Sequence, residues 1–474
     1  MLLNKSIKQL AELLQAKKIS SVDLVLESLS RIEKLNPQIN SFIKVKEKKE
    51  LLKIAERLDQ SRNKDSSVLH GIPFSLKDAY ITRDLQTTAA SKILHGFTPK
   101  FNATVYQKLI DANSILIGKN NMDAWGHGAS NENSDYGAVK NPWDLSRVAV
   151  GSSGGSAASI ASHMVSFAIG EDTGGSIRNP ASFCNISGLK VTYGRVSRYG
   201  AIAYASSLDT IGPMAKSVED LSFILEAIAG KDQLDASSSQ QKVDKYSKFL
   251  GQDIKNKIIG LPEEFLATSI DPEIKMAIEK AAQELEKLGA KIIPISIPTA
   301  KKAISIYYLI AASETSSNLA RYDSVRYGQG RSLFSDENCR RIILGTYALS
   351  AGYADKLYKN AQKARTLLIQ EYEAAFKKCD VLLAPVAPIL PTKLGELINN
   401  PLQNMLADLY TVTINIVGVP SLAIPAGFSK NKLPIGLQLI GKKFHEGELL
   451  QLGYAYQQVT TWHQQPASIL KHAK

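Results

Sequence analysis

The chain is poor in the features that mark secreted, membrane-spanning and metal-binding proteins. Its 474 residues include three cysteines and no CxxC pair, so neither a disulfide framework nor a zinc ribbon is expected. No run of about 18 or more apolar residues occurs, which argues against a membrane-spanning helix. Residues 1–6 lack the apolar core and cleavage site of a signal peptide. We therefore expect a reduced, cytoplasmic compartment, with the thiols acting as small buried side chains.

Motifs for nucleotide and metal chemistry are missing as well. The sequence contains no GxxxxGK phosphate loop, no dinucleotide fingerprint after a strand, and no His and Cys cluster with metal-ligand spacing. We therefore expect neither a cofactor nor a metal ion in this chain.

The charge balance is basic. With 57 Lys and Arg against 45 Asp and Glu, the net charge is +12, which makes an RNA-binding protein one alternative. Many lysines alternate with acids, as in residues 44–50, a pattern typical of solvated helix faces. No aromatic-plus-basic motif accompanies them. A positive surface is equally compatible with long-range attraction of a tRNA-bearing assembly.

Hydrophobic patterning predicts an α/β fold. Helical spacing dominates the first sixty residues, and a strand at 72–76 ends at Lys77. Further strands are predicted at 114–118, 257–260, 290–295, 380–385 and 421–425, with helices at 103–111, 272–288 and from 446 onward. This alternation favours a largely buried sheet with helices around it.

Two turns rich in glycine and serine lie between residues 148 and 194. The first, residues 151–156, reads GSSGGS, and the second, residues 172–178, reads DTGGSIR. The segment between them, 157–169, carries no Asp, Glu, Lys or Arg, which predicts burial rather than a flexible linker. Because glycine accepts positive φ, glycines packed around serines let backbone N–H groups converge on one point. Such a nest binds an anion or a developing oxyanion.

Ser176 is a candidate nucleophile in the second turn. Amide hydrolysis is helped by a nucleophile, a proton shuttle and an oxyanion site. Ser176 directly follows two glycines, so its hydroxyl can project from a turn whose N–H groups face the same point. Taken alone, the same serine could instead cap a helix.

A rival nucleophile lies in the first turn. Residues 151–155 match the G-x-S-x-G nucleophile elbow, with Ser153 as nucleophile and His445 as the downstream base. The motif is short and rich in glycine and serine, so chance matches are easy.

The order of Lys77, GSSGGS and DTGGSIR resembles the amidase signature family of serine hydrolases. The resemblance covers nearly the whole chain and is closer to one branch, the A subunits of glutamyl-tRNA(Gln) amidotransferases. The segments similar to that branch are residues 120–123, 130–134, 140–144, 193–200, 316–323 and 340–346. The chain departs from the branch at residues 124–127, AWGH, where a Glu-Phe-Ala-Met-type run is usual in the wall of the substrate pocket.

This resemblance implies a single amidase domain over residues 1–474, with a signature core at about 65–215. The implied fold is a large mixed, twisted sheet covered by helices on both faces. It also implies a Ser-Ser-Lys triad, in which Ser176 forms the acyl-enzyme, Ser152 in a cis peptide relays the proton, and Lys77 is the base. Burial would favour the neutral amine that a base requires. The implied oxyanion hole consists of Thr173, Gly174, Gly175 and Ser176.

The resemblance further implies a glutaminase that releases ammonia from glutamine. Ammonia would pass to the B subunit of the amidotransferase, which converts Glu-tRNA(Gln) to Gln-tRNA(Gln) with ATP and Mg²⁺, while a small C subunit clamps the heterotrimer. By alignment with the family, Arg341 would bind the carboxylate of glutamine, Asp408 its ammonium, and Tyr307 would line the pocket. The alternative within the family is a stand-alone amidase that acts on another small amide.

Overall fold

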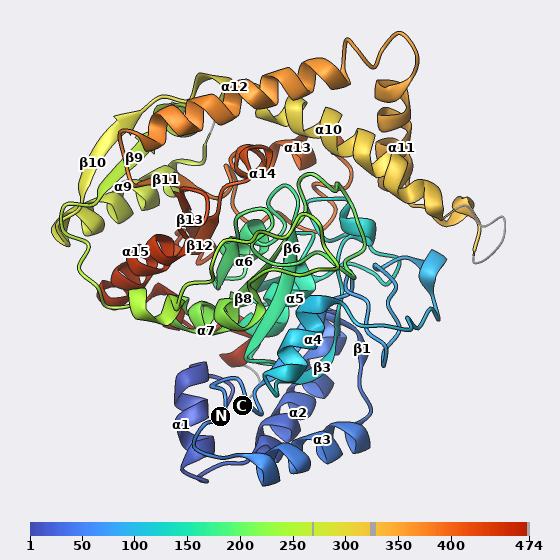
Figure 1. The fold of residues 1–474 in the computed structure, drawn as a ribbon, viewed down its shortest axis with the longest axis vertical. Helices are drawn as coiled ribbons and strands as arrows, with labels where there is room; N and C mark the ends of the chain where they lie inside the picture. The colour runs from blue at the N-terminus through green and yellow to red at the C-terminus, as the bar shows by residue number, and fades with distance from the viewer. Residues whose placement is uncertain (268–269, 323–328, 472–474) are drawn as a thin grey trace.

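A mixed sheet of eleven strands runs through the molecule (Figure 1). The structure is a computed structural model that describes residues 1–267, 270–322 and 329–471. Asp323, the last residue of one segment that resembles the amidotransferase branch, lies outside the described residues.

The order of the strands mixes both halves of the chain in one sheet. In space the strands follow the order β1 (Phe42–Val45), β3 (Ile115–Asn120), β2 (Pro73–Lys77), β6 (Phe167–Asp172), β8 (Thr210–Ala215), β7 (Ser187–Lys190), β12 (Ser421–Phe428), β13 (Pro434–Gly441), β11 (Val381–Pro385), β9 (Ile258–Pro262) and β10 (Lys291–Ile295). β2 is parallel to β3 and β6, and β9 is parallel to β10 and β11. The remaining neighbours are antiparallel. A small hairpin, β4 (Lys140–Asn141) and β5 (Asp144–Val148), stands apart.

One face of the sheet packs against a layer of five helices. These are α1 (Ile7–Gln15), α4 (Thr104–Asp111), α7 (Val218–Ile228), α9 (Pro272–Lys287) and α15 (Glu446–Val459). Their apolar sides form one cluster with strand residues such as Phe74, Leu76 and Ile169. Because side chains alternate along a strand, the residues between these point to the opposite face.

The opposite face is covered in two parts. Near β2 and β6 it packs against α2 (Ser21–Ile39), α3 (Lys48–Ser61), α5 (Gly154–Ala161) and α6 (Arg178–Phe183). Near β11 and β13 it packs against α10 (Ala303–Asn318), α12 (Tyr358–Phe376) and α14 (Val412–Val417). The described helices also include α8 (Glu263–Ala267), α11 (Asp336–Leu349) and α13 (Pro401–Leu406). Short 3₁₀ helices lie in the connections, namely η1 (Lys92–Leu94), η2 (Ala124–Gly126), η3 (Tyr246–Phe249), η4 (Pro298–Lys302), η5 (Leu319–Arg321), η6 (Arg331–Leu333), η7 (Trp462–Gln464) and η8 (Ser468–Lys471).

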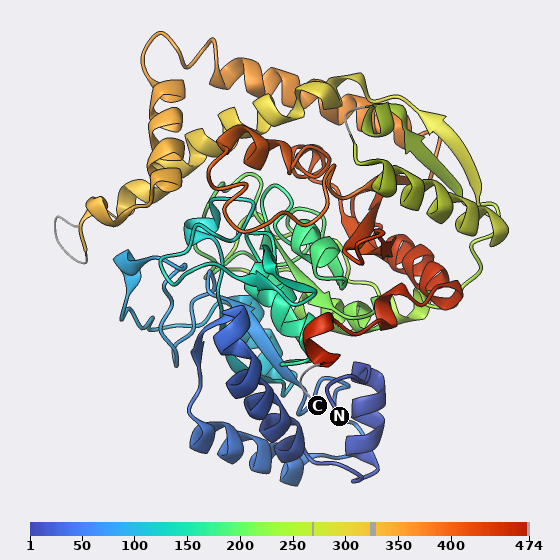
Figure 2. The same ribbon diagram turned by 180° about the vertical axis from the view of Figure 1, so that it is seen from behind.

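The two ends of the molecule are built from different parts of the chain. Helices α10, α11 and α12 arch over one end, and α1 to α3 form the other end, where both termini lie (Figures 1 and 2). Every helix of the described ranges is too short or too polar to cross a bilayer. This mixed sheet with helices on both faces confirms the predicted fold class.

Local sequence signals account for many of the element boundaries. α1 and α2 each begin at a capping box, in which Ser6 pairs with Gln9 and Ser20 with Asp23. The charge-free segment 157–169 is buried and forms the end of α5 and the start of β6. This confirms the prediction that it is core rather than linker.

Candidate active site

Lys77 is the last residue of β2 and is completely buried. Its Nζ donates a hydrogen bond to Ser152 Oγ at 2.6 Å and lies 3.3 Å from Glu171 Oε2. β2 lies between β3 and β6, so the end of the strand is fixed by parallel neighbours on both sides. The structure therefore brings together two of the three predicted triad residues.

Ser152 sits in the turn between β5 and α5. The Gly151–Ser152 peptide bond is cis, as the family resemblance predicts. Gly151 has no room for a side chain, because a Cβ there would overlap the carboxylate of Asp123. That carboxylate in turn accepts the N–H groups of Asn131 at 3.0 Å and Asn133 at 3.1 Å. The turn that holds Ser152 is thus packed against a loop anchored by a buried acid.

Asp172 shapes the second turn, which carries Ser176. Its carboxylate accepts the N–H groups of Gly175 at 2.9 Å and Ile177 at 3.1 Å. It also receives two hydrogen bonds from the guanidinium of Arg178, at 3.0 and 2.9 Å. Burial would raise the pKa of Asp172, but the charge and hydrogen bonds of Arg178 outweigh it and hold the pKa at about 2. The turn is therefore closed around a buried ion pair.

Arg178 ties this turn to distant parts of the chain. Its Nη2 donates to Asn415 Oδ1 at 2.6 Å, and its Nη1 donates to Gln438 Oε1 at 3.0 Å. Asn415 also donates to the carboxylate of Asp172 at 2.9 Å. Asp172 and Arg178 lie within the predicted motif, yet sequence reasoning gave neither a role. Nothing in the sequence marks Asn415 or Gln438 as their partners.

The backbone N–H groups of the second turn fall into two sets. That of Gly175 is donated to Asp172, and Gly175 has a φ of +141°, a conformation that suits glycine. The N–H groups of Thr173, Gly174 and Ser176 are donated to no acceptor in the described ranges of the chain. These three donors are free for an oxyanion. Gly175, which the resemblance also assigns to the oxyanion hole, instead donates its N–H to Asp172 and holds the turn in shape.

Ser176 is partly exposed and lies beside the first turn. The N–H of Ser153 donates to the carbonyl oxygen of Ser176 at 3.1 Å, so the two turns are joined directly next to Ser152. The hydroxyl of Ser153 is buried, donates to the carbonyl of Glu171 at 3.1 Å and accepts its N–H at 3.3 Å. His445, the base of the rival elbow, is half exposed and pairs with Glu448. Ser153 is thus committed to the β6 backbone, and the elbow interpretation loses its geometric basis.

The three predicted substrate-binding residues are buried, and two of them lie against the second turn or the helix that follows it. Tyr307 on α10 lies so close to Gly174 that a Cβ on that glycine would be 2.5 Å from its Oη. Asp408 accepts a hydrogen bond at 2.7 Å from Asn179, which follows the second turn and lies on α6. Arg341 on α11 donates through Nε to Glu337 Oε1 at 2.7 Å. Its Nη2 donates to no acceptor within the described ranges.

Tyr204 links these residues and had no distinguishing signal in the sequence. Its hydroxyl accepts hydrogen bonds from Arg341 Nη1 and from the hydroxyl of Tyr307, the latter at 3.3 Å. The guanidinium of Arg341 lies over the rings of Tyr204 and Tyr308, 5.6 and 5.1 Å from their centroids. The guanidinium of Arg341 thus packs against two aromatic rings, and its Nη2 has no hydrogen-bond acceptor among the described residues.

Burial sets the protonation of Asp408. It raises the pKa of this carboxyl to about 8, and the nearby charge of Arg341 opposes the shift. Asp408 therefore binds a proton far more readily than a solvent-exposed aspartate does.

Residues 124–127, where the sequence departs from the amidotransferase branch, contain η2 and contact the arch of helices through His127. His127 Nδ1 accepts a hydrogen bond from Asn338 Nδ2 on α11, and its Nε2 donates to Thr315 Oγ1 on α10, both at 2.8 Å. Burial lowers the pKa of His127 well below its ordinary value, so the ring is neutral. His127 also packs edge-on against Tyr204, with ring centroids 4.7 Å apart. Residues 124–127 therefore pack behind the residues that form the wall of the candidate pocket, with His127 against Tyr204.

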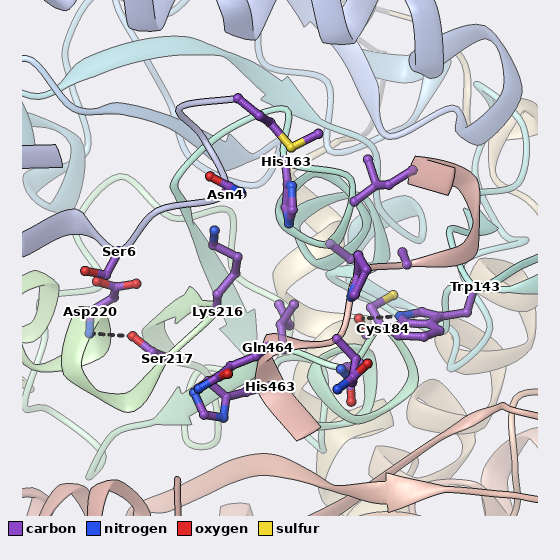
Figure 3. A pocket seen from close by; sticks show the side chains of 18 of the residues that line it. Asn4, Ser6, Trp143, His163, Cys184, Lys216, Ser217, Asp220, His463 and Gln464 are labelled. Carbon is purple, nitrogen blue, oxygen red and sulfur yellow. Dashed lines mark hydrogen bonds between the residues drawn. The ribbon is translucent and has the colours of Figure 1, made fainter. Parts of the chain in front are cut away.

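A cavity of about 740 Å³ lies away from these residues, between the two termini (Figure 3). Lys216, His163 and Asn4 point into it, and none of the predicted site residues lines it. No group of three or more His, Cys, Asp or Glu side chains in the described ranges is arranged to hold a metal ion.

Comparisons with known proteins agree with this geometry. The Amidase family model matches residues 23–450. The A subunit of glutamyl-tRNA(Gln) amidotransferase from Listeria innocua serovar 6a is 46% identical over 479 residues, covering 98% of this chain and 99% of that protein.

Two solved structures share the fold over almost their whole length. The A subunit of glutamyl-tRNA(Gln) amidotransferase from Thermotoga maritima matches with a TM-score of 0.84 and 36% identity, covering 97% of this chain and 96% of that one. The native peptide amidase of Stenotrophomonas maltophilia also matches with a TM-score of 0.84, at 30% identity and 98% coverage of both chains.

Proposed function

This chain belongs to the amidase family, and we propose that it is the glutamine-hydrolysing subunit of a tRNA-dependent amidotransferase. Two full-length relatives, from Listeria and Thermotoga, are named as the A subunit of glutamyl-tRNA(Gln) amidotransferase. One observation in the site carries the chemical part of the proposal. Lys77, buried at the end of β2, contacts the hydroxyl of Ser152 directly beside the turn that carries Ser176.

In the first half-reaction Ser176 Oγ attacks the side-chain carbonyl carbon of glutamine. Its proton passes through Ser152 to Lys77, so that a Ser–Lys relay takes the place of a histidine. The N–H groups of Thr173, Gly174 and Ser176 stabilise the negative oxygen as it forms. The C–N bond then breaks, the leaving nitrogen takes the proton back from Lys77 through Ser152, and ammonia departs.

In the second half-reaction water attacks the glutamyl ester on Ser176. The same relay removes a proton from this water and returns it to Ser176 Oγ when the ester bond breaks. Glutamate and the free serine result. Arginine could not replace Lys77 in these steps, because its guanidinium does not release a proton in proteins.

The α-carboxylate and α-ammonium groups of glutamine bind beside the nucleophile turn, which is the turn of residues 172–178 that carries Ser176. Nη2 of Arg341 binds the α-carboxylate, Asp408 binds the α-ammonium, and Tyr307 closes the pocket over Gly174. Tyr307 lies against Gly174, Asp408 contacts Asn179 just after that turn, and Arg341 is linked to Tyr307 through the hydroxyl of Tyr204. These contacts support the assignment. A charged pocket of this kind selects an amino acid over a simple amide.

The released ammonia serves a partner. We propose a cytoplasmic heterotrimer with the B and C subunits of the amidotransferase, in which the B subunit holds ATP and Mg²⁺ and amidates Glu-tRNA(Gln). The present chain contributes one amidase domain over residues 1–474, with its signature core at about 65–215. The eleven-stranded sheet, which joins strands from both halves of the chain, supports that single domain.

This division of labour is tested by measuring ammonia and Gln-tRNA(Gln) separately. The chain co-expressed with the B and C subunits should release ammonia from glutamine and form Gln-tRNA(Gln) only when ATP is added. The chain alone should form no Gln-tRNA(Gln) at all. Amidation of tRNA by the isolated chain would contradict the proposal.

A stand-alone amidase is the second candidate, because the fold matches that of a peptide amidase as well as it matches that of an amidotransferase component. Such an enzyme would hydrolyse amides that lack the α-amino and α-carboxyl groups at least as well as glutamine. It would also gain nothing from co-expression with the B and C subunits. Both measurements separate the two candidates.

A further inference from the structure

Glu171 is a buried acid beside Lys77 that has no role in the proposed mechanism. Its Oε2 lies 3.3 Å from Lys77 Nζ, while its Oε1 is buried and has no hydrogen-bond partner among the described residues. An unpartnered carboxylate oxygen is costly inside a protein, where the low dielectric penalises an unsatisfied charge. A carboxyl that accepts a proton at this oxygen removes that penalty.

The side chain of Glu171 projects from the face of the sheet opposite to the nucleophile turn. Phe167 and Ile169 belong to the cluster under α1, α4 and α7, so by alternation Glu171 lies on that face and Asp172 on the other. The turns that carry Ser152 and Ser176 thus lie on one side of Lys77, and the side chain of Glu171 lies on the other side.

A second acid, Asp209, lies next to Glu171 on that face. In the pairing of β6 with β8, Glu171 is opposite Ile211, and Asp209 precedes Ile211 by two residues. Such diagonal positions are about 7–8 Å apart between Cα atoms, within reach of long side chains. Asp209 Oδ1 also accepts a hydrogen bond from Thr173 Oγ1 at 2.7 Å, which connects it to the nucleophile turn.

Both acids line a cavity of about 300 Å³ that reaches the surface. Its lining includes Arg198 and Leu234, and Leu234 is 64% exposed. Burial raises the pKa of Glu171, and burial together with the charge of Glu171 raises the pKa of Asp209 to about 8. Both carboxyls therefore bind a proton more readily than a solvent-exposed acid does.

The proposed reaction leaves a proton behind. Glutamine and water give glutamate, neutral ammonia and one proton, since the new carboxylic acid ionises after the ester bond breaks. When ammonia leaves uncharged for the partner subunit, this proton stays in the site and must be removed before Lys77 can act again as a base. The charged and titratable groups around Glu171 are Lys77 on β2, Tyr80 beyond it, Asp172, Arg198 and Asp209.

We propose that Glu171 and Asp209 form a proton exit, which takes the residual proton from Lys77 and delivers it to solvent through the cavity beside Arg198. The proposal rests on the proposed function for the identity of the reaction. Glu171 acts through Lys77 and touches no substrate atom. It accepts the proton on the carboxylate, Lys77 returns to the neutral amine, and Asp209 passes the proton on.

The first test compares Glu171→Gln with the wild-type chain in the co-expressed complex. We expect kcat for glutamine to fall about 10- to 100-fold, with little change in KM and a shifted pH profile. Glu171→Asp retains a carboxyl and should recover most of the lost rate. Unchanged kcat and an unchanged pH profile in Glu171→Gln would overturn the proposal.

Chemical rescue separates proton transfer from a purely structural role. In Asp209→Asn, added imidazole or formate can enter the cavity and carry the proton, so the rate should rise with buffer concentration and saturate. The matched control is Asp235→Asn, which removes a carboxyl of the same cavity lining that contacts Arg198 and Ser237 rather than Lys77. If buffer accelerates neither variant, or both equally, Asp209 is not part of the exit.

A substrate that lacks the α-amino and α-carboxyl groups allows the proton exit to be tested independently of the proposed function. Hydrolysis of p-nitrophenyl acetate needs Ser176 and also releases a proton, but it does not need the pocket of Arg341 and Asp408. If wild type hydrolyses this ester but not glutamine, the proposed function fails while the slower turnover of Glu171→Gln still tests the exit. If wild type hydrolyses glutamine and Glu171→Gln is unaffected on both substrates, the exit fails alone.

Discussion

Lys77 Nζ and Ser152 Oγ lie 2.6 Å apart, although 75 residues separate them in the chain. The contact depends on two elements that are fixed independently. β2 ends at Lys77 between two parallel strands, and the turn before α5 presents Ser152 to that strand end. A proton relay that uses this contact depends on the ability of Lys77 to release and accept a proton, and not on its positive charge alone.

Replacing Lys77 by arginine should lower kcat for glutamine by about 10²- to 10⁴-fold, because the guanidinium remains protonated and cannot serve as a base. Steady-state ammonia release at saturating glutamine measures this. Lys18→Arg, on the exposed surface, is the control and should leave kcat unchanged. Near-full activity in Lys77→Arg would remove the lysine from the mechanism.

Replacing Arg178 by alanine should destabilise the fold by about 3–5 kcal/mol, because Asp172 would be left as a buried charge without its partner. In wild type the folded pKa of Asp172 is about 2, below its unfolded value, so this ion pair stabilises the protein above that unfolded value and the stabilisation is lost as pH falls towards 2. Urea unfolding at neutral pH measures the loss.

Arg178→Lys serves as the second variant where the alanine variant does not fold. It keeps the charge but not the fork that contacts Asp172, Asn415 and Gln438, so we expect a folded protein with reduced kcat. Wild-type stability in both variants would show that the nucleophile turn does not depend on this ion pair.

Much of the architecture could be predicted from the sequence, because the signals that form it are local. The strand ending at Lys77, the helices capped by Ser6 and Ser20, and the burial of segment 157–169 all follow from short-range patterns. Helix α10 was not predicted, and the reason is physical. It is buried over most of its surface, so it lacks the one-sided apolar stripe by which a helix is found in a sequence.

The candidate site likewise combines residues that local motifs predict with long-range contacts that no local pattern predicts. The order of Lys77, Ser152 and Ser176 is encoded in motifs, whereas the supporting contacts join residues far apart in the chain. Asn415 lies 237 residues from Arg178, and Tyr204 lies 137 residues from Arg341. Such pairs carry no periodicity or spacing. Glu171 was missed because a single acid beside Asp172 reads as one more strand-end charge.

Alanine at Arg341 or at Asp408 should lower kcat/KM for glutamine by about 30- to 150-fold, equivalent to the loss of a charge-assisted contact of about 2–3 kcal/mol. Ammonia-dependent formation of Gln-tRNA(Gln) by the complex bypasses this pocket and should be nearly unchanged. Arg340→Ala is the matched control, because the Arg340 side chain is substantially exposed next to Arg341. If both variants kept the wild-type kcat/KM, the amino-acid pocket would have to lie elsewhere.

Glutamine binding should weaken as pH falls below about 8. The pKa of Asp408 is raised by burial to about 8, so the carboxylate that pairs with the substrate ammonium is progressively lost below that pH. KM for glutamine should rise by up to about tenfold for each pH unit below the pKa, in proportion to the ionised fraction. The pH dependence of KM should disappear in Asp408→Asn, and a KM independent of pH in wild type would contradict the charged role of Asp408.

The most direct test follows the amide nitrogen of ¹⁵N-labelled glutamine in the complex formed with the B and C subunits. In the proposed mechanism Ser176 attacks glutamine, and Ser153 has a structural role. Wild type should release labelled ammonia and pass it to Gln-tRNA(Gln), and Ser153→Ala should retain most of that activity. Ser176→Ala should release none, yet its complex should still form Gln-tRNA(Gln) from added ammonia. Release of labelled ammonia by the Ser176→Ala complex, or a glutamyl adduct mapped to Ser153 by mass spectrometry, would contradict the central claim.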